Sequence, residues 1–141
     1  MAQATVTITY DDPLSACDSD QHSQWMYGTI SVSPAASTYA TGGLGTATSG
    51  PINWVVGDFP KVGNPVPLDV SLYSGATAGT TVGGFGYTWN KANNKFQITA
   101  SSGTQTAGTG TVSQELTNGT AIPAAVSNDT IRFAARFRKS I

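Results

Sequence analysis

The sequence predicts an all-β protein of one domain, a sandwich or barrel of short antiparallel strands, with long loops rich in Gly, Ser and Thr. Three observations predict this fold class. Residues 129–139 alternate apolar and basic side chains, short apolar runs are separated by turn residues along the whole chain, and no amphipathic stripe is long enough for an ordinary helix. A period of two indicates a half-buried strand, because successive side chains of a strand point to opposite faces of a sheet.

The candidate strands follow one another at short intervals. The first, at 5–10, alternates Val6, Ile8 and Tyr10 with threonines. The later ones are expected at 25–33, 52–56, 66–73, 84–90, 95–99, 112–116 and 130–139.

Three of these strands carry a distinct face. We expect one apolar face at Val66, Leu68, Val70 and Leu72. We expect an aromatic face at Phe85, Tyr87 and Trp89, in a strand that a short polar Lys-Ala-Asn-Asn loop joins to its antiparallel neighbour as a hairpin. The last strand places Ile131, Phe133, Ala135 and Phe137 on one side, and Arg132, Ala134, Arg136 and Arg138 on the other.

The connections at 34–51, 74–83 and 101–110 are long, polar and without periodicity. Loops of that size in a small domain are often functional or ordered by a partner. The length of 141 residues fits one domain over 1–141.

The charge of the chain argues against two classes of partner. The net charge is −1 and charged residues make up 11% of the sequence, well below the usual share of about 25%. We therefore expect no binding to nucleic acid and no binding to a membrane surface. No run approaches the ~20 apolar residues of a membrane span, and the first residues lack the basic and apolar regions of a signal peptide, so we expect synthesis in the cytoplasm.

A cluster of acids near the amino terminus is the first candidate for chemistry. It has two interpretations: carboxylates that hold a divalent cation, or a solvated loop. The spacing lacks the glycine and the distal glutamate of a calcium loop, and a single histidine excludes a metal motif with two histidines. The members are Asp11, Asp12, Asp18, Asp20 and His22, with Cys17 among them.

Other catalytic patterns are equally incomplete. Nothing in the sequence orients Cys17 as a nucleophile, and as the only cysteine it excludes an intrachain disulfide. Glu115 is the only glutamate and has no acid near it in sequence, and the glycines at 42–45 lack the Lys-Ser/Thr of a phosphate loop. We expect no catalytic residue, no metal, no cofactor and no enzymatic activity.

Two constellations remain open. Five aromatic residues form either a stacking platform for sugars or single-stranded nucleic acid, or part of the core: Trp25, Tyr27, Trp54, Tyr87 and Trp89. The row of Arg132, Arg136, Arg138 and Lys139 has three interpretations: a phosphate-binding stripe, a solvated or aggregation-resistant face, or a contact with an acidic protein.

Five short motifs, taken in order, resemble a group of small tailed-phage virion proteins of the capsid decoration, or cement, type. The likeness covers most of the chain from Gly28 onward, and it therefore separates an amino-terminal strand or arm at 1–27 from a sandwich like that of decoration proteins at 28–141. The motifs are Gly28-Thr-Ile-Ser-Val-Ser, Thr38-Tyr-Ala-Thr-Gly-Gly, Gly86-Tyr-Thr-Trp-Asn-Lys-Ala-Asn-Asn-Lys-Phe-Gln-Ile, Glu115-Leu-Thr-Asn-Gly-Thr and Asp129-Thr-Ile-Arg-Phe.

The resemblance implies a β-sandwich or jelly-roll-like protein that docks on the outside of an assembled capsid and stabilises it. The implied partners are the lattice of the major capsid protein and further copies of the chain, as a trimer or dimer, in a virion assembled in a bacterial host. Candidate contact residues are Arg132, Arg136, Arg138, Tyr39, Gly42 and Gly43. The alternatives are a carbohydrate-binding head fibre or receptor-binding module, a nucleic-acid-binding module that uses the terminal arginines, and a tail or neck component.

Overall fold

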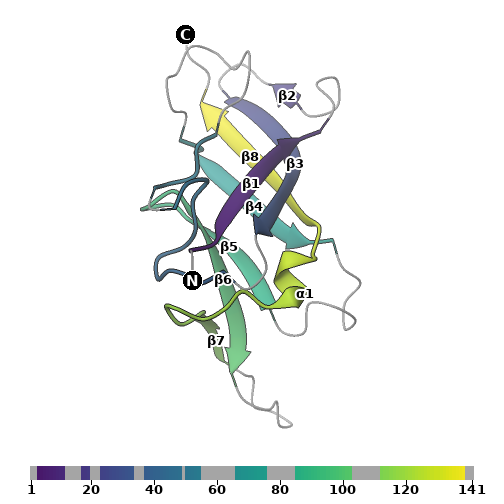
Figure 1. The fold of residues 1–141 in the computed structure, drawn as a ribbon. Coiled ribbons are helices and arrows are strands. Elements are labelled where there is room, and N and C mark those ends of the chain that lie inside the picture. The colour runs from purple at the N-terminus through teal and green to yellow at the C-terminus, as the bar shows by residue number, and fades with distance from the viewer. Residues whose placement is uncertain are drawn as a thin grey trace.

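The computed structural model describes residues 3–11, 17–19, 23–33, 37–48, 50–54, 66–75, 85–102 and 112–138 (Figure 1). Regular structure in these residues is almost entirely antiparallel strand, so the predicted all-β class is confirmed. The elements are β1 (Thr5–Tyr10), β2 (Cys17–Ser19), β3 (Ser23–Ser33), β4 (Asp69–Ser74), β5 (Phe85–Asn90), β6 (Lys95–Ser102), β7 (Val112–Glu115), α1 (Ala124–Ser127) and β8 (Ile131–Arg138).

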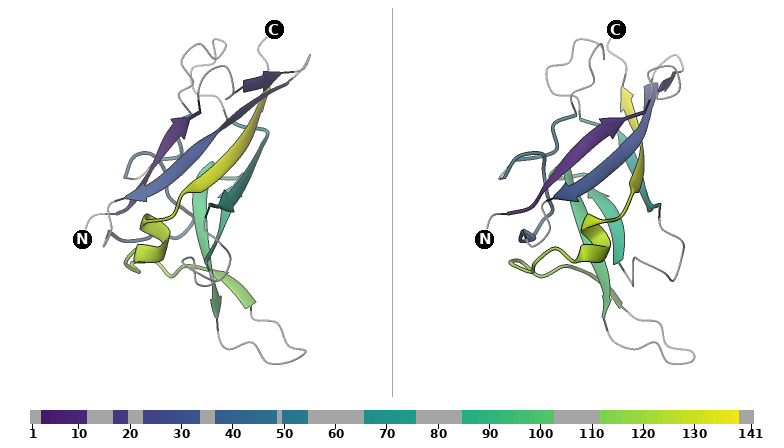
Figure 2. Two further views of the ribbon diagram at one scale, coloured as in Figure 1. Left: turned by 90° about the vertical axis from the view of Figure 1, so that its right-hand side faces the viewer. Right: turned by 45° about the vertical axis from the view of Figure 1, so that its right-hand side comes forward.

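The strands form two sheets. The larger sheet has five strands in the order β1-β3-β8-β4, with β2 paired to the other end of β3, and the smaller has the order β5-β6-β7. The smaller sheet extends beyond one end of the larger one, next to α1 (Figures 1 and 2). The jelly-roll topology remains a prediction, because these two strand orders do not by themselves establish it.

The strand β8 occupies an interior position of the larger sheet, between β3 and β4. Its sequence alternation becomes an alternation of burial: the four inward side chains are at most 1% exposed, whereas the outward ones are half-buried or exposed. The inward residues are Ile131, Phe133, Ala135 and Phe137, as predicted. The period of two therefore identified both the strand and its core face.

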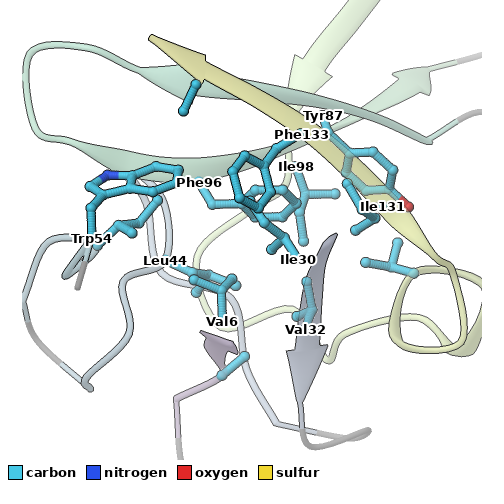
Figure 3. Close-up of a cluster of buried hydrophobic side chains, with 14 of the residues drawn as sticks. Val6, Ile30, Val32, Leu44, Trp54, Tyr87, Phe96, Ile98, Ile131 and Phe133 are labelled. Carbon is cyan, nitrogen blue, oxygen red and sulfur yellow. The ribbon is translucent and has the colours of Figure 1, made fainter. Parts of the chain in front are cut away.

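Side chains from both sheets meet in one hydrophobic core (Figure 3). The ring of Trp54 packs edge-on against Phe133 and Phe137, with centroids 5.5 Å and 5.7 Å apart. In the smaller sheet, Tyr87 stacks on Phe96 at 5.5 Å. Offset and edge-to-face ring pairs of this kind stabilise a core beyond the apolar area that they bury.

A segment with no regular strand fills the middle of this core. Residues 37–48 and 50–54 contribute Tyr39, Leu44, Ile52 and Trp54, all at most 3% exposed. Leu44 forms a two-way backbone bridge with Phe96, at N–O distances of 2.7 Å and 2.9 Å. The strand expected at 52–56 is wrong for residues 52–54, which do not join a ladder although Ile52 and Trp54 are buried. Residues 55 and 56 lie outside the described ranges.

The strand expected at 66–73 begins later, at Asp69. Pro67 lacks an N–H for a ladder hydrogen bond, and Val66 and Leu68 are 58% and 39% exposed. The predicted apolar face is therefore wrong at these two positions, although Val70 and Leu72 do pack against the core.

Two short elements were not predicted. The strand β2 spans three residues, and α1 spans four and begins directly after Pro123. Elements of this length are too short to produce a recognisable period.

The hairpin of β5 and β6 is confirmed, with Asn90 paired to Lys95. Asn94 closes its turn with a φ of 52°. Asparagine tolerates this left-handed conformation better than most residues other than glycine.

Candidate functional site

The outward face of the larger sheet carries the arginine row of β8 together with aromatic side chains of β3 and β4. We call this surface the arginine–aromatic face and define it by three rows that the strand register sets side by side. Across β3, β8 and β4, the rows are Trp25, Arg136 and Asp69; then Tyr27, Ala134 and Ser71; then Thr29, Arg132 and Tyr73. All of these side chains are half-buried or exposed.

The first row contains a cation held against an aromatic ring. The guanidinium carbon of Arg136 lies 5.9 Å from the centroid of the Trp25 ring. The ring of Tyr27 runs parallel to that of Trp25, with an interplanar angle of 4° and centroids 6.5 Å apart. Trp25 attracts Arg136, because a guanidinium is attracted to the face of an indole ring.

Arg132 lies in the third row and is engaged within the chain. Its Nη2 lies 2.6 Å from Oδ2 of Asp11, and its Nη1 lies 3.1 Å from Oδ1. The hydrogen bond to Asp11 is the main reason why the pKa of Arg132 is raised, and a hydrogen bond with Tyr73 adds to it. Arg132 therefore has less capacity to bind a partner than its neighbours in β8.

Arg136 and Arg138 differ from Arg132 in this respect. Within the part of the chain that the structure describes, neither forms an ion pair, and Nε of Arg136 is enclosed without a hydrogen-bond acceptor. Asp69 is the register partner of Arg136 on β4, but their side chains form no ion pair. The face therefore presents two arginines whose charge is not neutralised by an ion pair among the described residues.

The five aromatic residues considered from the sequence do not form one platform. Trp54 and Tyr87 lie in the core, and Trp89 packs against it from the smaller sheet. Only Trp25 and Tyr27 belong to the outward face. The core interpretation therefore holds for three of the five residues.

The other predicted contact residues lie away from this face. Tyr39 is 1% exposed, and its hydroxyl donates a 2.6 Å hydrogen bond to Oε1 of Glu115. The backbone N–H of Gly42 donates to the same oxygen at 2.7 Å. Glu115 thus attaches the 37–48 segment to the smaller sheet. Burial, together with the hydrogen bond to Glu115, raises the pKa of Tyr39.

The two glycines of this segment have backbone conformations that side chains rarely adopt. Gly42 has a φ of 95° and Gly43 a φ of 116°. A Cβ on Gly43 would also lie 2.8 Å from the carbonyl oxygen of Phe96. Tyr39, Gly42 and Gly43 therefore have evident roles in folding the chain, and their contact with a partner remains a prediction.

Two further polar side chains join segments that are distant in sequence. Oδ1 of Asn94 accepts hydrogen bonds from the indole N–H groups of Trp54, at 2.9 Å, and Trp89, at 3.1 Å. Oδ2 of Asp129 accepts from the hydroxyls of Tyr87 and Ser74, each at 2.7 Å. Sequence reasoning missed Asn94, Asp129 and the role of Glu115, because their partners are 40 or more residues away in most of these bonds.

The acidic cluster near the amino terminus is only partly described. Asp11 is engaged by Arg132, whereas Asp12, Asp20 and His22 lie outside the described residues. Of Cys17 and Asp18 only the backbone, in β2, is described. In the described ranges no three His, Cys, Asp or Glu residues gather as metal ligands, and no helix there is long and apolar enough to cross a membrane.

Comparison of the chain with protein-family models, with curated proteins and with solved structures finds no significant match.

Proposed function

We propose that this chain is a structural protein of a tailed-phage virion that docks on the outer surface of the assembled capsid and stabilises it. The observation that carries the proposal is the arginine–aromatic face, a sheet surface whose Trp, Tyr and Arg side chains are of the types enriched at protein interfaces. The order of the five sequence motifs supports the choice of a capsid as the partner.

The polar groups of the described core support a binding role over a reactive one. Glu115, Asp129 and Asn94 each accept two hydrogen bonds that join distant segments. These acceptors hold non-strand segments firmly on the sheets.

Capsid stabilisation follows from linkage. A protein that binds one state of the shell more tightly than another shifts the shell toward the preferred state. Many equivalent sites on a lattice make modest single-site affinity sufficient, and contacts between copies add to it.

We expect the purified chain to form a trimer or dimer. Light scattering measures this oligomeric state.

The test is binding to capsids of the phage that encodes the chain. Purified protein is mixed with mature, emptied and immature capsids, which are then pelleted. Binding in a fixed number of copies per shell, with a raised temperature of capsid disruption, is expected for at least one form. Absence of binding to all three forms would refute the proposal.

A second candidate is binding to carbohydrate, favoured by the parallel outward rings of Trp25 and Tyr27. Sugars stack on exposed aromatic rings, and tryptophan emission reports such contact. A change in emission with one glycan of a panel, lost in Trp25→Ala, would favour this function over docking on a capsid.

A further inference from the structure

We infer that the arginine–aromatic face is the docking face and that it takes a carboxylate-rich segment of the shell protein. This inference rests on the proposed function and names the partner's chemistry. Arg136 and Arg138 carry it, because neither forms an ion pair among the described residues and a cationic surface favours a partner of opposite charge.

Arg136 is the centre of the inferred contact. It lies in an interior strand of the larger sheet, between Trp25 on one neighbouring strand and Asp69 on the other. The guanidinium carbon lies 5.9 Å from the centroid of the Trp25 ring, a contact that lowers the side-chain entropy lost on binding. A guanidinium offers five N–H donors in a planar fork that matches a carboxylate.

The surroundings of Arg136 favour a protein partner. Tryptophan, tyrosine and arginine are the residues that most often dominate the energy of protein interfaces. Trp25, Tyr27 and Arg136 are adjacent here, and Tyr73, which is 56% exposed, extends the surface along β4. Arg138, two residues further along β8, is exposed and adds a second positive charge that forms no ion pair within the described residues.

Nucleic acid fits this face less well. Affinity for a phosphate backbone comes from several simultaneous cation contacts. Arg132 is already bound to Asp11, the chain has a net charge of −1, and only Arg136 and Arg138 remain unpaired among the described cations of this face. Arg136 beside the ring of Trp25, with Arg138 further along β8, suits a few carboxylates on a protein surface.

The experiment compares two double variants that each remove two positive charges. One is Arg136→Gln with Arg138→Gln. The control is Lys91→Gln with Lys95→Gln, at the β5–β6 turn in the other sheet. Capsid binding is measured as the protein concentration that half-saturates the shell, at low and at physiological salt, and folding is checked by the midpoint of thermal unfolding.

The arginine variant should need at least about a tenfold higher concentration than the wild type, the usual effect of losing one interface hot spot. The lysine variant should bind like the wild type. Wild-type binding should weaken as salt rises, and this salt dependence should be smaller in the arginine variant.

The outcomes separate the two proposals. If the wild-type chain binds no capsid form, the proposed function fails. If it binds and the arginine variant binds equally well, only the inferred face is wrong. If the arginine variant unfolds at a lower temperature, two single variants replace it in the test. Trp25→Ala should lose most of the capsid binding, and Arg136→Lys should lose part of it. Tight binding of the wild type to duplex DNA, lost in the arginine variant, would overturn the inference in favour of phosphate.

Discussion

Arg132 and Asp11 are 121 residues apart in the sequence, yet their side chains form a two-point ion pair. Asp11 directly follows β1 and its backbone N–H donates to the carbonyl of Tyr27 in β3, so the pair connects three neighbouring strands. The two side chains are 34% and 29% exposed, and solvent therefore screens much of their attraction.

Replacing Asp11 with Asn should lower the free energy of unfolding by about 0.5–1 kcal/mol, the range for a partly exposed pair with good geometry. Urea unfolding at low salt measures the loss, which should shrink in high salt because the pair is screened. An unchanged unfolding midpoint at low salt would show that the pair contributes nothing to stability.

Three buried tyrosines provide a matched test of the hydrogen bonds between segments. Tyr39 and Tyr87 donate to Glu115 and Asp129, whereas the hydroxyl of Tyr10 is buried without a partner among the described residues. Tyr39→Phe and Tyr87→Phe should each cost about 1–2 kcal/mol, and Tyr10→Phe should be neutral or stabilising. Equal losses in all three variants, measured by urea unfolding, would contradict this role of the hydrogen bonds.

Alkaline pH should unfold the protein through the same tyrosines. Burial raises the pKa values of Tyr10, Tyr39 and Tyr87 above the ordinary value of about 10. A group whose pKa is raised in the folded state contributes stability that is complete below the unfolded pKa and is lost as the pH rises toward the folded pKa. Stability should therefore hold up to about pH 10 and fall above it.

Circular dichroism at graded pH measures this loss, and absorbance at the tyrosinate band reports ionisation. Part of the ionisation should coincide with unfolding. In Tyr39→Phe, the decline of stability with pH should be less steep, because one linked proton is removed. Full ionisation of all tyrosines in a protein that remains folded would contradict the prediction.

Gly28 and Gly50 differ in the space that they leave for a side chain. A Cβ on Gly28 would overlap the carbonyl oxygen of Thr9 and lie 2.8 Å from Cε1 of Phe133, whereas a Cβ on Gly50 would meet nothing within 4 Å. Gly28→Ala should cost about 2–3 kcal/mol or more through overpacking between β1 and β3. Gly50→Ala should stay within about 0.5 kcal/mol of the wild type. Similar unfolding midpoints for the two variants would disprove this close packing at Gly28.

The sequence predicted what depends on local periodicity. The buried row of β8 and the β5–β6 hairpin are both readable from alternation and turn residues, and the structure confirms them. The first residues alternate in the same way and do form β1.

Contacts between distant segments were not predictable in this way. Leu44 and Trp54 belong to the core but lie in a segment with no period, and their positions depend on Phe96 and Asn94 in the β5–β6 hairpin. Glu115 seemed isolated because no acid lies near it in sequence, yet its partners are Tyr39 and Gly42. The same limit applies to the face: alternation identified Arg136 as outward, but only the strand register set it beside Trp25.

The central claim is that the chain docks on a capsid shell, and a reconstruction by electron microscopy of capsids incubated with the purified protein tests it most directly. We expect regular density for a two-sheet domain on the outer surface, with the arginine–aromatic face and Arg136 turned toward an acidic segment of the shell protein. The absence of added density on the outer surface, with the protein in molar excess over the capsid subunits, would contradict the claim.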